Sequence, residues 1–282
     1  MRNGKLSVIV PAYNEQATVA LLARSVTETL EKENIPFDIV FVNDGSSDGT
    51  WGEIERAARK YGNVHGVCFD RNYGKDCALY AGLSAFSGDC AATMDCDLQH
   101  PPQTLITMYR MWQSGCDCVE GIKKERGDAG SAHGLCADIF YSLLSAAVGS
   151  DMRGTSDFKL LDRSAAEKIL AKRTHFYRAA PVCAGIHGAQ TEYAVAERAG
   201  GNTKWSFTAL VKYMLFALAS VSHAALAVCI TASLITAAVS VLFYAYSHYA
   251  AGVLFTLLFV PCAACTALCL KKPKRYGILK TI

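Results

Sequence analysis

The sequence predicts an α/β domain built on a doubly wound, mainly parallel sheet and followed by two transmembrane helices. The first observation is that short apolar runs alternate with segments of helical periodicity up to about residue 121. Such alternation is typical of a parallel sheet with helices packed on both faces. The second observation is a stretch of 58 residues, 213–270, that contains no Asp, Glu, Lys or Arg.

The pattern places the elements in order. The run "LSVIVP", residues 6–11, is short, apolar and ended by a proline, as expected of a buried parallel strand. Apolar residues then recur at helical spacing from Val19 to Leu30 and predict a helix that ends near Glu33. Further strands are expected at residues 37–42, 64–69, 90–94 and 116–121. Further helices are expected at residues 50–61, from the loop "DRNYGKD" to about residue 86, and at residues 101–114.

Three acidic turns fall where predicted strands end. They are "PAYNE" at residues 11–15, "NDGSSD" at residues 43–48 and "DCDLQ" at residues 95–99. Ligands of doubly wound sheets bind beyond the carboxyl ends of the strands, so these turns indicate one binding site. The sequence holds neither G-x-G-x-x-G nor G-x-x-x-x-G-K-[ST], and we therefore expect neither a dinucleotide fingerprint nor a P-loop.

The third turn predicts a metal site. Alternate side chains of an extended chain share a face, so Asp95, Asp97 and Gln99 can present oxygens to one side. Two carboxylates and an amide oxygen suit Mg²⁺ or Mn²⁺, which would also relieve the repulsion between the carboxylates. The alternative is a solvated turn with a capping aspartate. We expect His100 to be fixed in the loop before Pro101 rather than to bind the metal, and Cys96 to point away from it.

The uncharged stretch predicts a membrane protein. A spanning helix needs about 20 apolar residues, so the stretch has room for two spans, at residues 219–244 and 250–270, joined by a turn. Basic residues flank the pair but are absent from the turn, which puts both flanks in the cytosol by the positive-inside rule. The alternative is a pair of buried helices in a soluble protein, which rarely lack charge for so long. The flanking basic residues are Lys204, Lys212, Lys271, Lys272, Lys274 and Arg275.

The expected organisation has four parts. A cytosolic catalytic domain spans residues 1–203, an interfacial amphipathic segment 204–218, the two transmembrane helices 219–270 and a basic cytosolic tail 271–282. The expected location is the cell inner membrane. A net charge of +3 is too small to suggest a nucleic-acid partner. The twelve scattered cysteines fit reduced thiols better than a disulfide framework.

Six motifs occur in an order that resembles a known family. They are "VIVPAYNE", "VNDGSSDGT", "RNYGKDCAL", "MDCDLQHPP", "TSDFKLLDR" and "GNTKW". The chain resembles family 2 glycosyltransferases of the GT-A fold, and within them the polyprenyl-phosphate glycosyltransferases: bactoprenol glucosyltransferases and, more distantly, dolichol-phosphate mannose synthase. The resemblance implies a nucleotide-sugar donor, often a UDP-sugar, a polyprenyl-phosphate acceptor, and Mg²⁺ or Mn²⁺ as cofactor. It also implies a homo-oligomer.

The resemblance implies a role for each site residue. Asp97, Asp157 and Lys204 would be catalytic, and Asp95, Asp97 and Gln99 would surround the metal ion. The implied nucleotide-sugar site consists of Pro11, Ala12, Tyr13, Glu15, Asp44, Lys75 and Asp95. The implied acceptor-phosphate site consists of Lys123, Lys124, Arg126, Lys159 and Lys204. Lys159 stands where arginine is common in the family, and a lysine binds phosphate as a point charge without a bidentate fork.

The implied reaction inverts the anomeric centre in a single displacement. The acceptor phosphate is already an anion near neutral pH, so positioning and charge shielding matter more than a general base. Whether Asp157 takes a proton or only positions a substrate stays open. Two alternatives are a polysaccharide synthase, which usually carries a Q-x-x-R-W motif that this chain lacks, and a membrane scaffold that binds nucleotide without turnover. The sugar and the base are not specified.

Overall fold

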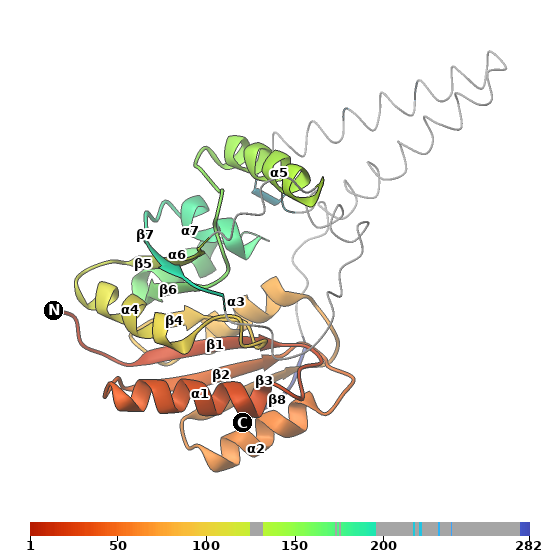
Figure 1. The fold of residues 1–282 in the computed structure, drawn as a ribbon. Helices are drawn as coiled ribbons and strands as arrows, with labels where there is room; N and C mark the ends of the chain where they lie inside the picture. The colour runs from red at the N-terminus through yellow and green to blue at the C-terminus, as the bar shows by residue number, and fades with distance from the viewer. Residues whose placement is uncertain are drawn as a thin grey trace. The chain divides into compact units, whose positions relative to one another are not determined.

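The computed structural model of the chain describes residues 1–124, 132–172, 174, 176–195 and 277–282, without the side chains of 132–139, and isolated positions between 217 and 238 (Figure 1). The chain divides into two compact units. The first comprises Met1–Ala129, Gly154–Asn202 and Arg275–Ile282, and the second comprises Gly130–Arg153 and Thr203–Lys274. The first unit overlaps the predicted catalytic domain, 1–203, but it leaves out 130–153 and Thr203 and includes 275–282. The predicted domain bounds stay a prediction.

The first unit contains an eight-stranded sheet with the order β7-β5-β6-β4-β1-β2-β3-β8. Its centre is parallel: β1 pairs with β2 and β4, and β2 pairs with β3. β5 is also parallel to β7, whereas β6 runs antiparallel to β4 and β5, and β8 antiparallel to β3. The strands are β1 Leu6–Ala12, β2 Phe37–Asn43, β3 Val64–Phe69, β4 Cys90–Thr93, β5 Cys118–Lys123, β6 Lys159–Asp162, β7 Ala189–Tyr193 and β8 Ile278–Thr281.

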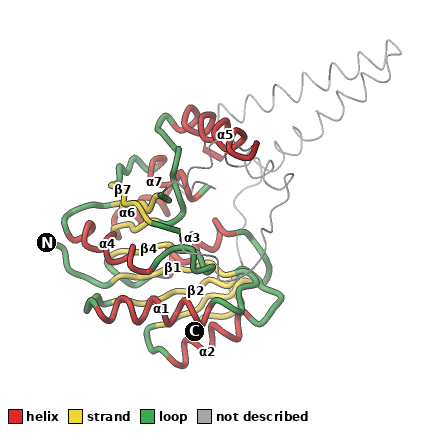
Figure 2. The backbone as a smooth tube through the Cα atoms, viewed as in Figure 1, coloured by secondary structure: helices red, strands yellow, loops and turns green. Residues whose placement is uncertain are grey.

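Helices cover both faces of this sheet, which is why the central strands are apolar throughout. One face carries α1, α2 and α4, which pack on Val8, Val10 and Phe41. The other carries α3, α6 and α7, which pack around Ile9 and Leu161. Figure 2 shows α1 and α2 side by side along the sheet. The helices of this unit are α1 Val19–Lys32, α2 Thr50–Lys60, α3 Lys75–Ala85, α4 Pro102–Gln113, α6 Arg163–Lys172, the 3₁₀ helix η1 Tyr177–Ala179, and α7 Ala180–Cys183.

The predicted elements of the first 114 residues are confirmed, with ends that differ by a residue or two. The strand predicted at 116–121 begins two residues later, at Cys118. Its predicted start closes α4 instead, because Gly115 adopts φ 115° and the Cys116 N–H donates to the Met111 carbonyl oxygen at 3.2 Å. The fold class is thus α/β with a mixed, mainly parallel sheet, as expected for the predicted catalytic domain.

The strand β8 covers the outer edge of β3. Gly66 and Ile282 exchange both backbone hydrogen bonds, at 2.9 and 3.0 Å, and the Asp70 N–H donates to the Gly277 carbonyl oxygen at 3.1 Å. An uncovered β3 would offer a row of free N–H and C=O groups to other chains. The segment predicted to be a basic tail therefore supplies a strand to the first unit.

The described helix of the second unit is α5, Ala132–Val148. The chain folds back after it, because the Ser145 hydroxyl accepts the Met152 N–H at 2.9 Å and Met152 is fully buried. Within the described part of the chain, no helix has the length and apolar character needed to cross a membrane. The predicted spans at 219–244 and 250–270 and the segment 204–218 lie, apart from isolated positions, outside that part.

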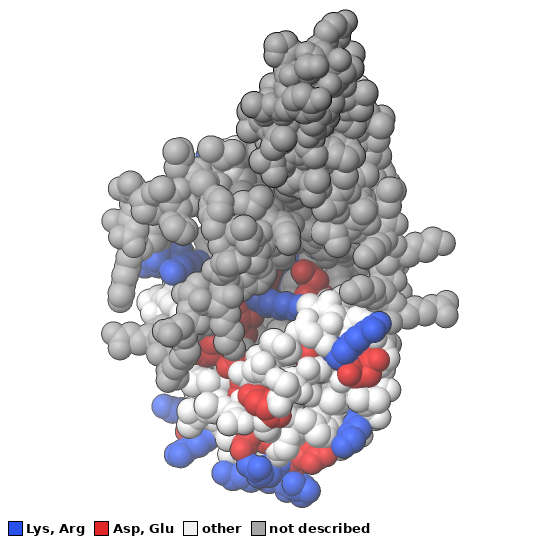
Figure 3. All heavy atoms as spheres, turned by 90° about the vertical axis from the view of Figure 1, so that its right-hand side faces the viewer, with Lys and Arg blue, Asp and Glu red and all other residues white. Residues whose placement is uncertain are grey.

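The charged side chains on the described surface are mixed in sign. Figure 3 shows lysine and arginine interspersed with aspartate and glutamate on the face it presents. This distribution agrees with the small net charge of +3.

Close packing of α3 on β1 makes Gly82 a sensitive position. A Cβ atom there would lie 2.2 Å from Cγ2 of Ile9, which is fully buried and β-branched. We expect Gly82→Val to destabilise the domain by about 1–3 kcal/mol, the usual cost of overpacking a core. Thermal unfolding of the purified protein measures this. Gly62→Val is the matched control, because no atom lies within 4 Å of a Cβ at Gly62; equal loss in both variants would contradict the packing argument.

Candidate active site

The turns after β1 and β2 are joined to each other. The Asn14 N–H donates to the Ser46 hydroxyl at 3.0 Å, and the Ser47 N–H donates to Oδ1 of Asn14 at 2.9 Å. The Glu15 N–H donates to the Thr50 hydroxyl at 2.8 Å. Two of the three predicted acidic turns therefore meet at the carboxyl edge of the sheet. The first of them contains the predicted nucleotide-site residues Pro11, Ala12, Tyr13 and Glu15.

Asp44, at the end of β2, organises the loop after β3. Its two carboxylate oxygens accept the N–H groups of Tyr73 and Gly74 at 2.7 and 2.9 Å. Burial raises the pKa of Asp44, and these two N–H groups oppose the rise. The neighbouring Gly45 adopts φ 63° and a Cβ there would lie 2.1 Å from the Arg71 carbonyl carbon, so only glycine fits. Asp44 thus fixes the loop that carries Lys75; its direct contact with a nucleotide stays a prediction.

Lys75, the first residue of α3, connects two carboxylates from different loops. Its ammonium nitrogen lies 2.7 Å from Oδ1 of Asp95, which follows β4, and 2.9 Å from Oδ2 of Asp157, which precedes β6. The two loops meet because β6 runs antiparallel to β4, with Thr93 opposite Lys159. The structure therefore brings together three residues that the sequence analysis selected from three separate motifs.

Arg178 completes this cluster and was missed by the sequence analysis. From η1, its Nη2 lies 3.2 Å from Oδ2 of Asp157 and its Nε donates to Oδ1 at 3.3 Å. The Tyr177 N–H donates to Oδ1 of Asp76 at 2.8 Å, which anchors η1 to α3. The signal available in the sequence was a single arginine in the apolar run "FYRAAP", too weak to select without knowledge of the fold.

The cluster is held in its ionised form. Burial alone would raise the pKa of Asp157, but the charges of Lys75 and Arg178 outweigh it and hold that pKa well below its usual range. Burial alone would lower the pKa of Lys75, but Asp157 and Asp95 outweigh it and raise that pKa above its usual value. Two cations thus balance two carboxylates, and Asp157 is a weak proton acceptor.

The third acidic turn differs from the extended geometry that we predicted. β4 ends at Thr93, and the chain turns through Leu98, which adopts a left-handed φ of 63°. The Gln99 N–H donates to Oδ1 of Asp97 at 3.1 Å within this turn. The extended chain was therefore the wrong reason for grouping the three oxygens. The turn nevertheless leaves Asp95, Asp97 and Gln99 partly exposed on the surface of the site.

The donor set of this turn fits a hard divalent cation. Cys96 points into the core, as expected, with its sulfur 3.4 Å from the Thr18 hydroxyl, and burial raises the pKa of its thiol to about 12. His100 is also structural: Nδ1 accepts the Asp95 N–H at 3.0 Å, and the ring stacks on Phe158. The oxygens of Asp95, Asp97 and Gln99 remain as donors. Among the described residues, no group of three or more His, Cys, Asp and Glu side chains could hold a metal ion. The predicted set is a different kind of site, because it consists of two carboxylates and the amide oxygen of Gln99.

Lys159 is buried, contrary to its predicted place in the acceptor-phosphate site. Its side chain is 2% exposed and forms an ion pair with Glu120, which also accepts the Ser156 N–H at 2.9 Å. The pair supports the loop that carries Asp157, whose carbonyl oxygen accepts the Thr93 hydroxyl. Because Lys159 is buried and paired with Glu120, it is not placed to contact an acceptor phosphate.

Of the other four residues predicted to bind the acceptor phosphate, the structure describes two. Lys123 and Lys124 are exposed at the end of β5, on the same edge of the sheet as the acidic turn. Arg126 and Lys204 lie outside the described residues, so their roles stay predictions.

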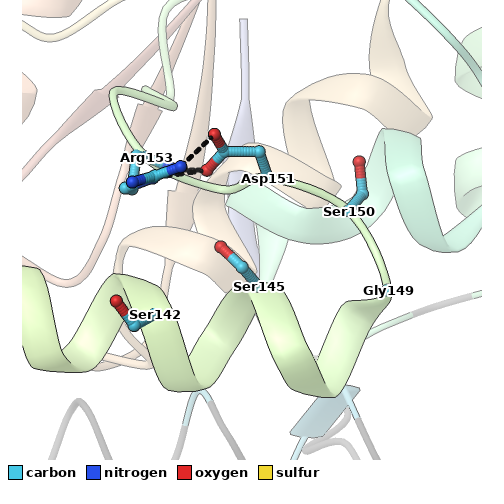
Figure 4. A pocket seen from close by; sticks show the side chains of 6 residues that line it. All are labelled: Ser142, Ser145, Gly149, Ser150, Asp151 and Arg153. Atoms are coloured by element: carbon cyan, nitrogen blue, oxygen red, sulfur yellow. Dashed lines mark hydrogen bonds and ion pairs between the residues drawn. The ribbon is translucent and has the colours of Figure 1, made fainter.

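A cavity in the second unit has no part in this site. It has a volume of about 470 Å³ and opens at the end of α5 (Figure 4). Arg153 and Asp151 pair with each other at 2.9 Å in its wall. None of the predicted site residues lines it, and we assign it no chemistry. Its lining residues are Ser142, Ser145, Gly149, Ser150, Asp151 and Arg153.

Comparison with known proteins identifies the family. The model of "Glycosyl transferase family 2" matches residues 7–170, more than half of the chain. The chain belongs to glycosyltransferase family 2. This confirms the family resemblance and makes the protein a glycosyltransferase, an enzyme rather than a scaffold.

Curated relatives of this glycosyltransferase cover most of its length. The bactoprenol glucosyl transferase of Shigella phage SfV is 32% identical over 245 residues, which are 86% of this chain and 80% of the relative. The prophage bactoprenol glucosyl transferase homolog of Escherichia coli K12 is 31% identical over 245 residues, with the same shares.

Solved structures confirm the GT-A fold of the glycosyltransferase. Glucosyl-3-phosphoglycerate synthase from Mycobacterium tuberculosis, in complex with Mn²⁺, uridine diphosphate and phosphoglyceric acid, superposes with a TM-score of 0.57 at 21% identity. The match covers 77% of this chain and 76% of that one. At this identity the likeness shows the fold alone.

Asp76 gives the glycosyltransferase a testable pH dependence. Burial, with the charge of Asp157, raises the pKa of Asp76 to about 6, from an ordinary value of 3.8. The unfolded chain therefore releases this proton first, and folding stability is lost as pH rises from about 4 to about 6. Asp76→Asn removes the titration, while its amide oxygen can still accept the Tyr177 N–H.

We expect the wild type to lose about 1–3 kcal/mol more stability than Asp76→Asn between pH 4 and pH 7, at roughly 1.4 kcal/mol per unit of pKa shift. Thermal unfolding midpoints across this range measure the difference. Glu28→Gln, on the exposed face of α1, is the control and should follow the wild type. Parallel curves for wild type and Asp76→Asn would show that Asp76 does not titrate in this way.

Proposed function

We propose that this glycosyltransferase moves a single sugar from a UDP-sugar to polyprenyl phosphate, with inversion and with a divalent cation, at the cytosolic face of the membrane. The observation that carries the proposal is the cluster of Lys75, Asp95, Asp157 and Arg178 at the carboxyl edge of the sheet, beside the turn that contains Asp97. The lipid acceptor is supported by the bactoprenol glucosyl transferases that align with 86% of this chain at 31–32% identity.

The donor side follows from the acidic turn. Structures of the same fold contain uridine diphosphate with Mn²⁺ or with Mg²⁺. In this chain Asp95, Asp97 and Gln99 have the oxygens to hold such an ion, which would stabilise the charge that develops on the departing nucleoside diphosphate. The joined turns after β1 and β2, with Tyr13 43% exposed, provide a surface for the nucleoside.

The acceptor side explains the state of Asp157. Polyprenyl phosphate is an anion near neutral pH and attacks without first losing a proton. A carboxylate whose pKa is held low by two cations is a poor general base, since proton transfer is most efficient when the pKa lies near the working pH. Asp157 therefore positions Lys75 and Arg178 near the reacting groups and takes no proton from the acceptor.

With a lipid acceptor, the apolar stretch 213–270 would anchor the enzyme beside its substrate. Residues 213–270 contain no charged side chain, and Lys and Arg flank them on both sides. Two spans with both flanks in the cytosol would keep the active site on the side where nucleotide-sugars are made and would keep it close to the lipid phosphate.

Transfer to the lipid tests the proposal. The purified protein in detergent receives Mn²⁺ or Mg²⁺, undecaprenyl phosphate and radiolabelled UDP- and GDP-sugars in turn. We expect label in the organic phase from one UDP-sugar and equal release of nucleoside diphosphate. Asp97→Ala should lose at least about 100-fold in rate, as for removal of one strong transition-state contact. Glu28→Ala, on an exposed part of α1, should keep the wild-type rate.

Two outcomes would change the proposal. Label in a water-soluble polymer would indicate a polysaccharide synthase. No label from any donor, with nucleotide still bound, would reject the lipid acceptor.

Membrane insertion is tested separately. We expect the full chain to stay with the membrane fraction after washing at alkaline pH, because two apolar spans are effectively irreversible anchors. Washing with concentrated salt at neutral pH is the control that removes proteins bound only by charge. Release of the chain by the alkaline wash would contradict the two predicted spans.

A further inference from the structure

Lys75 occupies a carboxylate that the proposed metal ion needs. Its ammonium nitrogen is 2.7 Å from Oδ1 of Asp95, and Asp95 is one of the two carboxylates in the acidic turn. A divalent cation on Asp95 would repel an ammonium group at that distance, because like charges on one carboxylate compete for it. The two cations therefore exclude each other from Asp95 to a large extent.

The remaining contacts of the cluster allow Lys75 to leave. Asp157 keeps Arg178 on both of its oxygens, at 3.2 and 3.3 Å, so it stays paired when Lys75 moves. The Lys75 side chain is 40% exposed, and its flexible four-carbon stem can change direction without moving the backbone. The backbone of this loop is itself fixed, because Asp44 holds the N–H groups of Tyr73 and Gly74.

The position of Lys75 on its helix also favours release. It is the first residue of α3, where the helix dipole disfavours a cation and favours an anion. The two carboxylates compensate for this in the structure. A phosphate group near the start of α3 would compensate for it equally well.

We propose that Lys75 acts as an exchange group: it holds Asp95 until a divalent cation binds there, and its ammonium then turns to a phosphate oxygen of the nucleotide-sugar. The inference rests on the proposed function, since it requires a metal ion and a diphosphate donor. It makes Lys75 a competitor of the metal ion in the free enzyme and a ligand of the donor in the loaded enzyme. No covalent bond is formed or broken in the exchange; the ion pair between Lys75 and Asp95 is replaced by metal coordination at Asp95 and by an ion pair between Lys75 and a phosphate oxygen.

Binding measurements in the full chain test this, independently of sugar transfer. In Lys75→Met we expect Mn²⁺ to bind about 3- to 10-fold more tightly than in wild type without nucleotide, because its competitor is gone. At saturating Mn²⁺, UDP should bind about 10-fold more weakly to the same variant, because a phosphate contact is lost. The free Mn²⁺ signal in electron paramagnetic resonance measures the first, and calorimetry measures the second.

Two further variants separate exchange from a general disturbance. Arg178→Met removes a cation that contacts Asp157 and leaves the Lys75–Asp95 pair, so Mn²⁺ affinity without nucleotide should not rise. Lys75→Arg keeps the positive charge and should restore much of the competition. A merely structural role for Lys75 predicts weaker binding of both Mn²⁺ and UDP in Lys75→Met.

The outcomes decide the inference and distinguish it from the proposed function. Equal or weaker Mn²⁺ binding by Lys75→Met would overturn the exchange, whatever the transfer activity. Binding changes of opposite sign would support it even if no sugar reaches the lipid, in which case only the acceptor proposal fails. Absence of Mn²⁺ binding by the wild type would overturn both the exchange and the metal dependence.

Discussion

The site depends on one ammonium group shared between two carboxylates from separate loops. Without Lys75, Asp95 and Asp157 would face each other in a partly buried site with only Arg178 to balance them. A buried carboxylate without a partner is costly, so Asp157 needs at least one cation at all times, and Arg178 remains on it when Lys75 moves. Two further contacts hold the backbone of the loops that carry these charges. Asp44 fixes the loop before Lys75, and the Lys159–Glu120 pair supports the loop before β6.

The sheet topology makes the assembly possible. If two neighbouring strands are parallel, the loop before one strand and the loop after the other lie at opposite edges of the sheet. Because β6 is antiparallel to β4, the loop before β6 lies at the same edge as the loop after β4, and Asp157 reaches Lys75. The same reversal puts Lys159 beside Glu120 of β5 inside the sheet. One antiparallel strand therefore both completes the cluster and removes a lysine from the surface.

This explains what the sequence could and could not predict. The sequence was enough to predict the strands up to residue 94 and the turn residues Asp44, Asp95 and Asp97. Apolar runs and the acidic residues that end them are local signals. The pairing of Lys159 and the position of Arg178 depend on which strands are neighbours, and short strands such as β6 carry no such information. The strand β8 was missed for the same reason: its partner β3 lies more than two hundred residues earlier.

A site for two anionic substrates has an electrostatic problem that this cluster can solve. The donor diphosphate and the acceptor phosphate both need positive charge, yet exposed cations that await them would be solvated and mobile. Here Lys75 is held by carboxylates at close range until the metal ion competes for Asp95, while Arg178 stays paired with Asp157. Binding then exchanges partners instead of creating unpaired charge, so most of the reorganisation takes place within a framework that the backbone has already fixed. A low pKa at Asp157 follows from the same arrangement, which makes its weakness as a base a consequence of its role in holding the cations.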